Sequence, residues 1–166
     1  MLKGQDIVVL AALMDGENAE ETYAELGMRV CLSASETHAA VRRLQDAMLV
    51  SGARRLFKRN VLEFLAHGLR YAFPFRPAGT MARGLATSYA APVAEGSFAA
   101  TGMNPVWSHS SGNVYGQAFE PLYATAPRAA ANNRKLYDRL AVLDMLRGGR
   151  LRERQFAERK LSEFIR

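Results

Sequence analysis

The chain has 166 residues, about half of them apolar and 23% charged, which is typical of a folded protein with one or two domains. Its single cysteine, Cys31, excludes an internal disulfide and a cysteine-based metal site, and it favours a reducing, cytoplasmic setting. No apolar run approaches the roughly 20 residues that cross a bilayer. The first residues lack the pattern of a signal peptide, so we expect an unexported protein.

The net charge of +6 is distributed unevenly along the chain. Residues 1–41 contain two cations and seven acids, whereas residues 42–83 contain nine cations and two acids. Residues 84–166 contain eleven cations and seven acids. A basic block of this kind indicates a polyanion as partner. A solvated surface rich in arginine is the alternative, and charge alone does not separate the two.

The first part of the chain predicts two helices. Residues 3–14 place apolar side chains at helical spacing, and the Asp-Gly pair at 15–16 ends this pattern. Thr22, followed three residues later by Glu25, is typical of a capping box, in which each side chain bonds to the other residue's backbone. We expect the helix that it opens to run to about Val30, with its inward side formed by Tyr23, Leu26 and Val30.

A third helix follows almost at once. Ser33 and Glu36 form a second capping-box pattern. Only Cys31 and Leu32 separate this helix from the preceding one, and so short a link forces a sharp angle between them, as in a helix-turn-helix unit. The helix is expected to end near Ala47, and one face is predicted to point inward through Thr37, Val41, Leu44 and Met48.

The outward side of the helix opened by Ser33 is small or polar. A narrow ridge with hydrogen-bonding groups, here Ser35, His38 and Arg42, suits a helix that approaches base edges in the major groove. Arg42 or Arg43 can hold a guanine or a phosphate, and Ser33 and Ser35 can bind phosphate with the free backbone N–H groups of the helix start. A solvated helix face is the alternative interpretation of the two arginines.

Further cations follow this helix. They are expected to contact the DNA backbone, which adds affinity and salt dependence but no sequence information. The residues concerned are Arg54, Arg55, Lys58 and Arg59. Residues 69–73 alternate between apolar and other side chains, which predicts a strand, and residues 83–90 are expected to form the second strand of a hairpin at 69–90. This hairpin would be a wing, with Arg76 at its tip directed toward the adjacent minor groove.

Segment 3–90 resembles the winged helix-turn-helix of bacterial transcription regulators of the MarR-like kind, most strongly over residues 22–50. The matching stretches are Thr22-Tyr23-Ala24-Glu25-Leu26, Leu32-Ser33-Ala34-Ser35-Glu36-Thr37-His38 and Val41-Arg42-Arg43-Leu44. The resemblance implies that the helix opened by Ser33 enters the major groove, with DNA contacts from Ser33, Ser35, Thr37, His38 and Arg42.

Two features depart from that family. Its turn often contains glycine where this chain has Cys31, for which a left-handed backbone would cost roughly 1 kcal/mol. Its wing also usually follows the groove-reading helix quickly, whereas a helical pattern over residues 55–67, ended by Gly68, intervenes here.

The remainder of the chain predicts an extension. Residues 93–125 favour short strands or ordered loops, and residues 129–147 and 150–165 predict two helices separated by Gly148-Gly149. We therefore expect an α+β, mainly helical protein, with a winged helix-turn-helix domain over 1–92. A C-terminal extension over 93–166 would serve packing, dimerisation or effector binding.

No motif for catalysis, a metal or a cofactor occurs. His38, His67 and His109 lack partners at metal-ligand spacing, and Ser108 beside His109 does not make a triad, which is defined by geometry. The sequence has no phosphate loop, nucleophile elbow or dinucleotide fingerprint. The aromatic residues between positions 71 and 123 are interpreted as core, with an effector pocket as the alternative.

These observations predict sequence-specific binding of double-stranded DNA by a homodimeric transcription regulator, with repression favoured, no enzymatic activity and no cofactor. A small molecule or protein effector is a further candidate partner, and no membrane partner is expected. The alternative is a winged-helix interaction module that docks an acidic protein or an RNA. Glu36 and the acidic first 41 residues favour that alternative because they repel phosphate.

Overall fold

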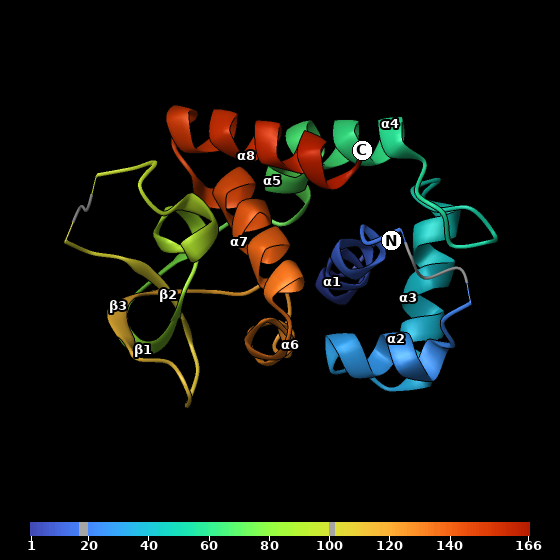
Figure 1. Ribbon diagram of the computed structural model, residues 1–166, viewed down its shortest axis with the longest axis horizontal. Helices are drawn as coiled ribbons and strands as arrows, with labels where there is room; N and C mark the ends of the chain where they lie inside the picture. Colours follow the sequence, from blue (N-terminus) through green and yellow to red (C-terminus); the bar gives the residue numbers. More distant parts are fainter. Residues whose placement is uncertain (17–19, 100–101) are drawn as a thin grey trace.

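The computed structural model describes residues 1–16, 20–99 and 102–166. This part of the chain is mainly helical with a small three-stranded sheet, which confirms the predicted α+β class (Figure 1). Its helices are α1 (Gly4–Leu13), α2 (Tyr23–Val30), α3 (Ala34–Asp46), α4 (Lys58–Glu63), α5 (Leu69–Ala72), α6 (Ala126–Asn132), α7 (Arg134–Gly148) and α8 (Leu151–Phe164). A π-helical turn η1 (Phe64–Gly68) and two 3-10 turns, η2 (Ser88–Ala90) and η3 (Pro92–Ala94), complete the helical set, and the strands are β1 (Pro77–Ala86), β2 (Pro105–Ser108) and β3 (Val114–Phe119).

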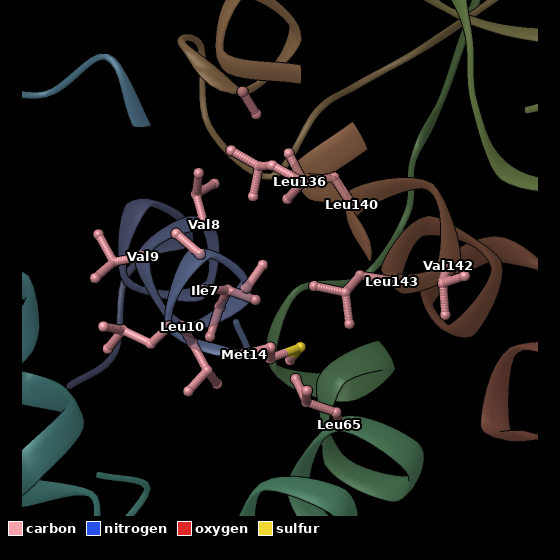
Figure 2. Packing of buried hydrophobic residues seen from close by; sticks show 14 of the residues in the cluster. Ile7, Val8, Val9, Leu10, Met14, Leu65, Leu136, Leu140, Val142 and Leu143 are labelled. Atoms are coloured by element: carbon pink, nitrogen blue, oxygen red, sulfur yellow. The ribbon is translucent and has the colours of Figure 1, made fainter. Parts of the chain in front are cut away.

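Helix α1 forms the centre of the core. Its residues from Asp6 to Leu13 are all buried, because the helix is apolar on every side and neighbours cover it all round. It packs against α2, α3 and α7. Figure 2 shows Ile7, Val8 and Leu10 of α1 near Leu136 and Leu140 of α7 and Leu65 of η1. The N-terminal helices and the C-terminal helices therefore share one core.

Helices α2 and α3 form the tight two-helix unit that the sequence predicts. The backbone N–H of Thr22 donates to the Glu25 carboxylate at 2.7 Å, and the Thr22 hydroxyl accepts from the Glu25 N–H at 3.2 Å. The turn between the helices contains Cys31 in the left-handed conformation, with φ 56°. A cysteine thus occupies the position where a left-handed backbone favours glycine.

A very short hairpin follows α3 directly. Val50 and Leu56 form an antiparallel bridge, and the Ser51 N–H donates to the Arg55 carbonyl at 2.8 Å; we call this segment the 50–56 hairpin. Met48 precedes it with a left-handed backbone, φ 56°, and its side chain is 58% exposed. The prediction that Met48 faces inward is therefore wrong, because the chain leaves the helix before that position.

The predicted hairpin at 69–90 is wrong. Residues 58–72 are helical throughout, so Gly68 does not end the helix, and Leu69–Phe73 does not form a strand. Val61, Leu65 and Leu69 are all buried, and their spacing of four continues the helical face across the π turn. Five alternating residues were too short a window to separate this helix from a strand.

Strand β1 belongs to a sheet with later segments instead. It runs antiparallel to β2, with Leu85 opposite Trp107, and antiparallel to β3, with Arg83 opposite Tyr115, while β2 and β3 pair in parallel. Gly84 is required where the three strands converge, because a Cβ there would lie 1.7 Å from the Trp107 carbonyl oxygen. The predicted boundary between residues 92 and 93 thus falls between paired strands.

The C-terminal helices are close to the prediction. The helix expected at 129–147 is divided into α6 and α7 at Asn133, whose side chain accepts from the Leu136 N–H at 3.1 Å and caps α7. Helix α8 follows the Gly148-Gly149 pair as expected. In Figure 1, α8 lies along one edge of the molecule beside α4, while the sheet and α3 lie at opposite ends.

Candidate nucleic-acid interface

The outward side of α3 is exposed. Ser33, Ser35, His38 and Arg42 are accessible to solvent, as the spacing predicts. The opposite side packs on α1 through buried residues, Ala40, Val41 and Leu44. Figure 1 shows α3 at the edge of the molecule, with α6 and α7 on the other side of α1. Within the described residues, the later segments therefore leave this side of α3 open.

Thr37 does not lie on that surface. It is fully buried, and its hydroxyl donates to the Ser33 carbonyl at 2.8 Å. The prediction that Thr37 contacts DNA is therefore wrong, while its predicted place on the inward face is confirmed.

The N-terminus of α3 already holds a carboxylate. The Ser33 backbone N–H and hydroxyl both donate to Glu36, at 2.9 and 2.7 Å, and the Ser33 hydroxyl accepts from the Glu36 N–H. These hydrogen bonds from Ser33 hold the pKa of Glu36 below its ordinary value, so its charge persists at neutral pH. A phosphate would meet this charge at the helix start, which argues against Ser33 as an anion ligand.

Arg43 is held by α1 rather than presented to solvent. Its Nε and Nη2 atoms donate to the two carboxylate oxygens of Asp6 at 2.8 and 2.7 Å. Asp6 has no exposed side-chain area. The hydrogen bond to Asp6 raises the pKa of Arg43. Of the two adjacent arginines, Arg42 alone has its side chain on the exposed side of α3.

The predicted backbone-contact cations gather around the 50–56 hairpin. Arg55, in the hairpin, and Lys58 and Arg59, in the first turn of α4, are exposed. Arg54 is half-buried, and its guanidinium carbon lies 5.1 Å from the centroid of the Tyr23 ring. The structure therefore brings Arg54 and Arg55 beside the two-helix unit, as predicted from their order in the chain.

Arg76 lies away from this surface. It immediately precedes β1, and the sheet and α3 lie at opposite ends of the molecule in Figure 1. The prediction of Arg76 at the tip of a wing is wrong, because no hairpin forms over residues 69–90 and Arg76 precedes the first strand of the sheet.

Tyr23 is a residue of this surface that sequence reasoning assigned only to the interior. Its ring meets the His38 ring edge-on, with centroids 4.9 Å apart and planes at 87°, and the Arg54 side chain also packs over it. Sequence spacing did not identify this contact, because it depends on how α2 packs against α3.

A network of ion pairs joins α2 to the end of α1 and to α7. Arg29 donates to Asp15 at 2.6 Å and to Glu21, and Arg139 of α7 binds the second Asp15 oxygen at 2.5 Å. Burial raises the pKa of Asp15, but the hydrogen bond and charge of Arg139 and the charges of Arg29 and Lys135 outweigh it, so the pKa lies below its ordinary value. Arg29 is thus committed to the fold.

The aromatic residues between 71 and 123 divide between the two interpretations. Trp107 is buried and Phe75 stacks on Phe119, as expected of core, whereas Tyr71 and Tyr115 are exposed. A cavity of about 530 Å³ is lined in part by Tyr89, the partly buried Phe98 and small side chains of residues 85–96.

Comparisons with protein-family models, with curated proteins and with solved structures find no match for this chain. No helix in the described ranges has both the length and the apolar character needed to cross a membrane. Among the same residues, no group of three or more histidine, cysteine, aspartate or glutamate side chains is placed to hold a metal ion.

Proposed function

We propose that this protein binds duplex DNA through α3 and the 50–56 hairpin, and that it acts as a transcription regulator. The observation that carries the proposal is the open outward side of α3, with the exposed cations of the hairpin and α4 next to it. A helix followed at once by a short hairpin is the order of elements in a winged helix-turn-helix, in which the helix enters the major groove and the wing meets the flanking backbone.

The roles of the residues follow from their positions. Arg42, midway along the open side of α3, is suited to a guanine edge or a phosphate. Arg55, Lys58 and Arg59 supply phosphate contacts at one flank. Glu36 repels phosphate at the start of α3, but its carboxylate can accept a hydrogen bond from the amino group of cytosine. We therefore place the backbone contacts near the hairpin rather than at Ser33.

Selection from a random pool of duplexes, followed by fluorescence anisotropy, tests this function. We expect Arg42→Ala to weaken binding of the selected duplex about tenfold, within the range of one good base contact. Arg76→Ala is the matched control, because it removes the same charge from an exposed arginine just before β1, and the sheet lies at the opposite end of the molecule from α3 (Figure 1). Absence of measurable binding by the unaltered chain at low salt, or equal losses in both variants, would contradict the proposal.

Pairing of two copies belongs to the same proposal. Groove-reading units commonly bind as dimers, because two half-sites about one helical turn apart increase specificity. Light scattering in the presence and absence of the selected duplex checks this point. Selected sequences with two inverted half-sites and a complex containing two chains are the expected result, whereas a one-to-one complex on a single half-site would exclude pairing on DNA.

A docking module for another protein is the second candidate function. Glu36 and Asp46 are both exposed near the two ends of α3, while Arg42 is the cation on its open side. This charge balance is unfavourable for phosphate and compatible with a protein partner. Co-purification that returns one stoichiometric protein and no nucleic acid would favour this function over DNA binding.

A further inference from the structure

Tyr23 contacts two separate parts of the proposed DNA surface. It is the first residue of α2, its ring lies edge-on to His38 of α3, and its ring also carries the guanidinium of Arg54 from the 50–56 hairpin. The three residues are far apart in sequence but form one continuous contact at the surface. The ring therefore connects the hairpin to α3 through the first turn of α2.

The tip of the 50–56 hairpin is the part that this contact joins to α2. The base of the hairpin is attached to α3, because the Val50 N–H donates to the Leu44 carbonyl at 3.4 Å and Gln45 Nε2 donates to the Ser51 carbonyl at 3.3 Å. The two arms share the single bridge between Val50 and Leu56, and so little pairing does not by itself fix the direction of the tip. The tip is closed by hydrogen bonds from the Arg54 N–H to the Ser51 carbonyl, at 2.9 Å, and from the Arg55 N–H to the Ser51 hydroxyl. These bonds fix the shape of the tip, and the bonds to α3 fix the base, whereas the contact of Arg54 with Tyr23 joins the tip to α2.

Arg54 has a backbone conformation that suits this role. Its φ of 58° is left-handed, which is unfavourable for a side chain other than glycine or asparagine. The turn sends Arg54 back over Tyr23 while its neighbour Arg55 stays exposed. Arg54 thus packs against the protein, whereas the adjacent Arg55 faces solvent.

We propose that Tyr23 is a positioning residue, which clamps the 50–56 hairpin to α2 and α3 so that Arg55 and His38 face the same duplex at a fixed separation. The inference rests on the proposed function for the identity of the ligand. The clamp itself is a property of the free protein, so it can be measured without DNA.

Limited trypsin digestion of the full chain measures the clamp directly. Trypsin cleaves after arginine, so release of the hairpin exposes the bonds that follow Arg54 and Arg55. We expect Tyr23→Ala to be cut there about five times faster, because proteolysis follows the population of the open segment. Tyr23→Phe keeps the ring and should be cut within about twofold of the unaltered rate. Mass spectrometry identifies the cut.

Tyr71→Ala is the matched control for this digestion. Tyr71 is exposed and also carries an arginine over its ring, but that arginine is its neighbour Arg70, so the contact joins no separate elements. Its cleavage at the hairpin should equal that of the unaltered chain. Should Tyr23→Ala fail to fold by circular dichroism, Arg54→Gln breaks the same contact from the hairpin side, and cutting after Arg55 is the measurement.

A DNA-binding measurement then uses the selected duplex and the same variants. Tyr23→Ala should bind about fivefold more weakly, with a salt slope lower by roughly one phosphate contact, and Tyr23→Phe should restore both. Equal cutting of Tyr23→Ala and the unaltered chain would overturn the clamp, and faster cutting with unchanged DNA affinity would overturn its positioning role. Faster cutting in a chain that binds no duplex would leave the clamp standing and reject the proposed function.

Discussion

Arg43 and Asp6 join α3 to α1 through two parallel hydrogen bonds, of 2.8 and 2.7 Å, although the two residues are 37 positions apart. The Asp6 carboxylate also accepts from the Lys3 N–H at 2.8 Å and so caps α1. A buried carboxylate that loses its cation is strongly destabilising, since the remaining charge keeps its desolvation cost without compensation. The pair therefore ties the orientation of α3 to the core.

The first prediction separates the two adjacent arginines. Arg43→Ala should lower the free energy of unfolding by about 3 kcal/mol, because it leaves Asp6 buried and unpaired. Arg42→Ala should change it by less than about 0.5 kcal/mol, as expected of an exposed position. Urea denaturation followed by circular dichroism measures both values. Equal stabilities of the two variants would show that the Arg43–Asp6 pair does not support the fold.

The second prediction concerns stability in acid. Because the pKa of folded Asp15 lies below its ordinary value of 3.8, its ion pairs stabilise the fold above that pH, and this contribution is lost as the pH falls through the lower, folded-state pKa. The free energy of unfolding should fall more steeply below about pH 4 in the unaltered chain than in Asp15→Asn. Urea titrations at several pH values between 6 and 2.5 provide the comparison, and parallel curves would contradict it.

The third prediction concerns the attachment of the sheet to α7. The buried Asp144 carboxylate accepts from Trp107 Nε1 and Thr87 Oγ1, each at 2.8 Å, and from Arg147 at 2.7 Å. Asp144→Ala should cost about 3–5 kcal/mol, since it leaves the buried Arg147 without its carboxylate and with only the carbonyls of Phe73 and Glu120 as partners. Thr87→Val, which removes one donor, should cost about 1 kcal/mol.

Trp107 provides the signal for this measurement, because it is the only tryptophan in the sequence and is 1% exposed. Its emission should shift to the red in Asp144→Ala under conditions where the unaltered chain is folded. An unshifted spectrum together with unchanged stability would mean that this carboxylate does not hold the sheet in place.

The fourth prediction uses the charge at the start of α3. Glu36→Gln removes a persistent negative charge from the proposed DNA surface, and it should strengthen binding of random duplex roughly threefold at low salt, with the gain fading as salt increases. Glu95→Gln, an exposed position beside η3, is the control and should leave affinity unchanged. No change in Glu36→Gln would show that the start of α3 does not approach the duplex, which would contradict the placing of α3 in the groove.

Local signals located the helices well. The capping boxes at Thr22 and Ser33 predicted where α2 and α3 begin, because each box involves residues only three positions apart. The 50–56 hairpin escaped prediction because one bridge and a left-handed arginine leave little periodic pattern. The predicted strand at 69–73 failed for the opposite reason, since a short alternation there is also part of a helical face.

The candidate site, like the fold, was predictable only where local spacing determines the position of a residue. Spacing identified the open side of α3, including His38 and Arg42, because a helix fixes which residues share a side. Spacing alone did not distinguish Arg43 from Arg42, since its partner Asp6 is brought near by tertiary packing. The contact of Tyr23 with Arg54 likewise depends on how the hairpin folds back over α2.

The central place of α1 has a consequence for biosynthesis. Helix α7, which completes the packing around α1, comes more than a hundred residues later in the chain. A nascent chain that has emerged only as far as α3 can therefore cover α1 only in part. Such distant contacts slow folding and prolong the exposure of apolar surface. During translation, the side of α1 that packs on α7 therefore stays exposed until α7 leaves the ribosome.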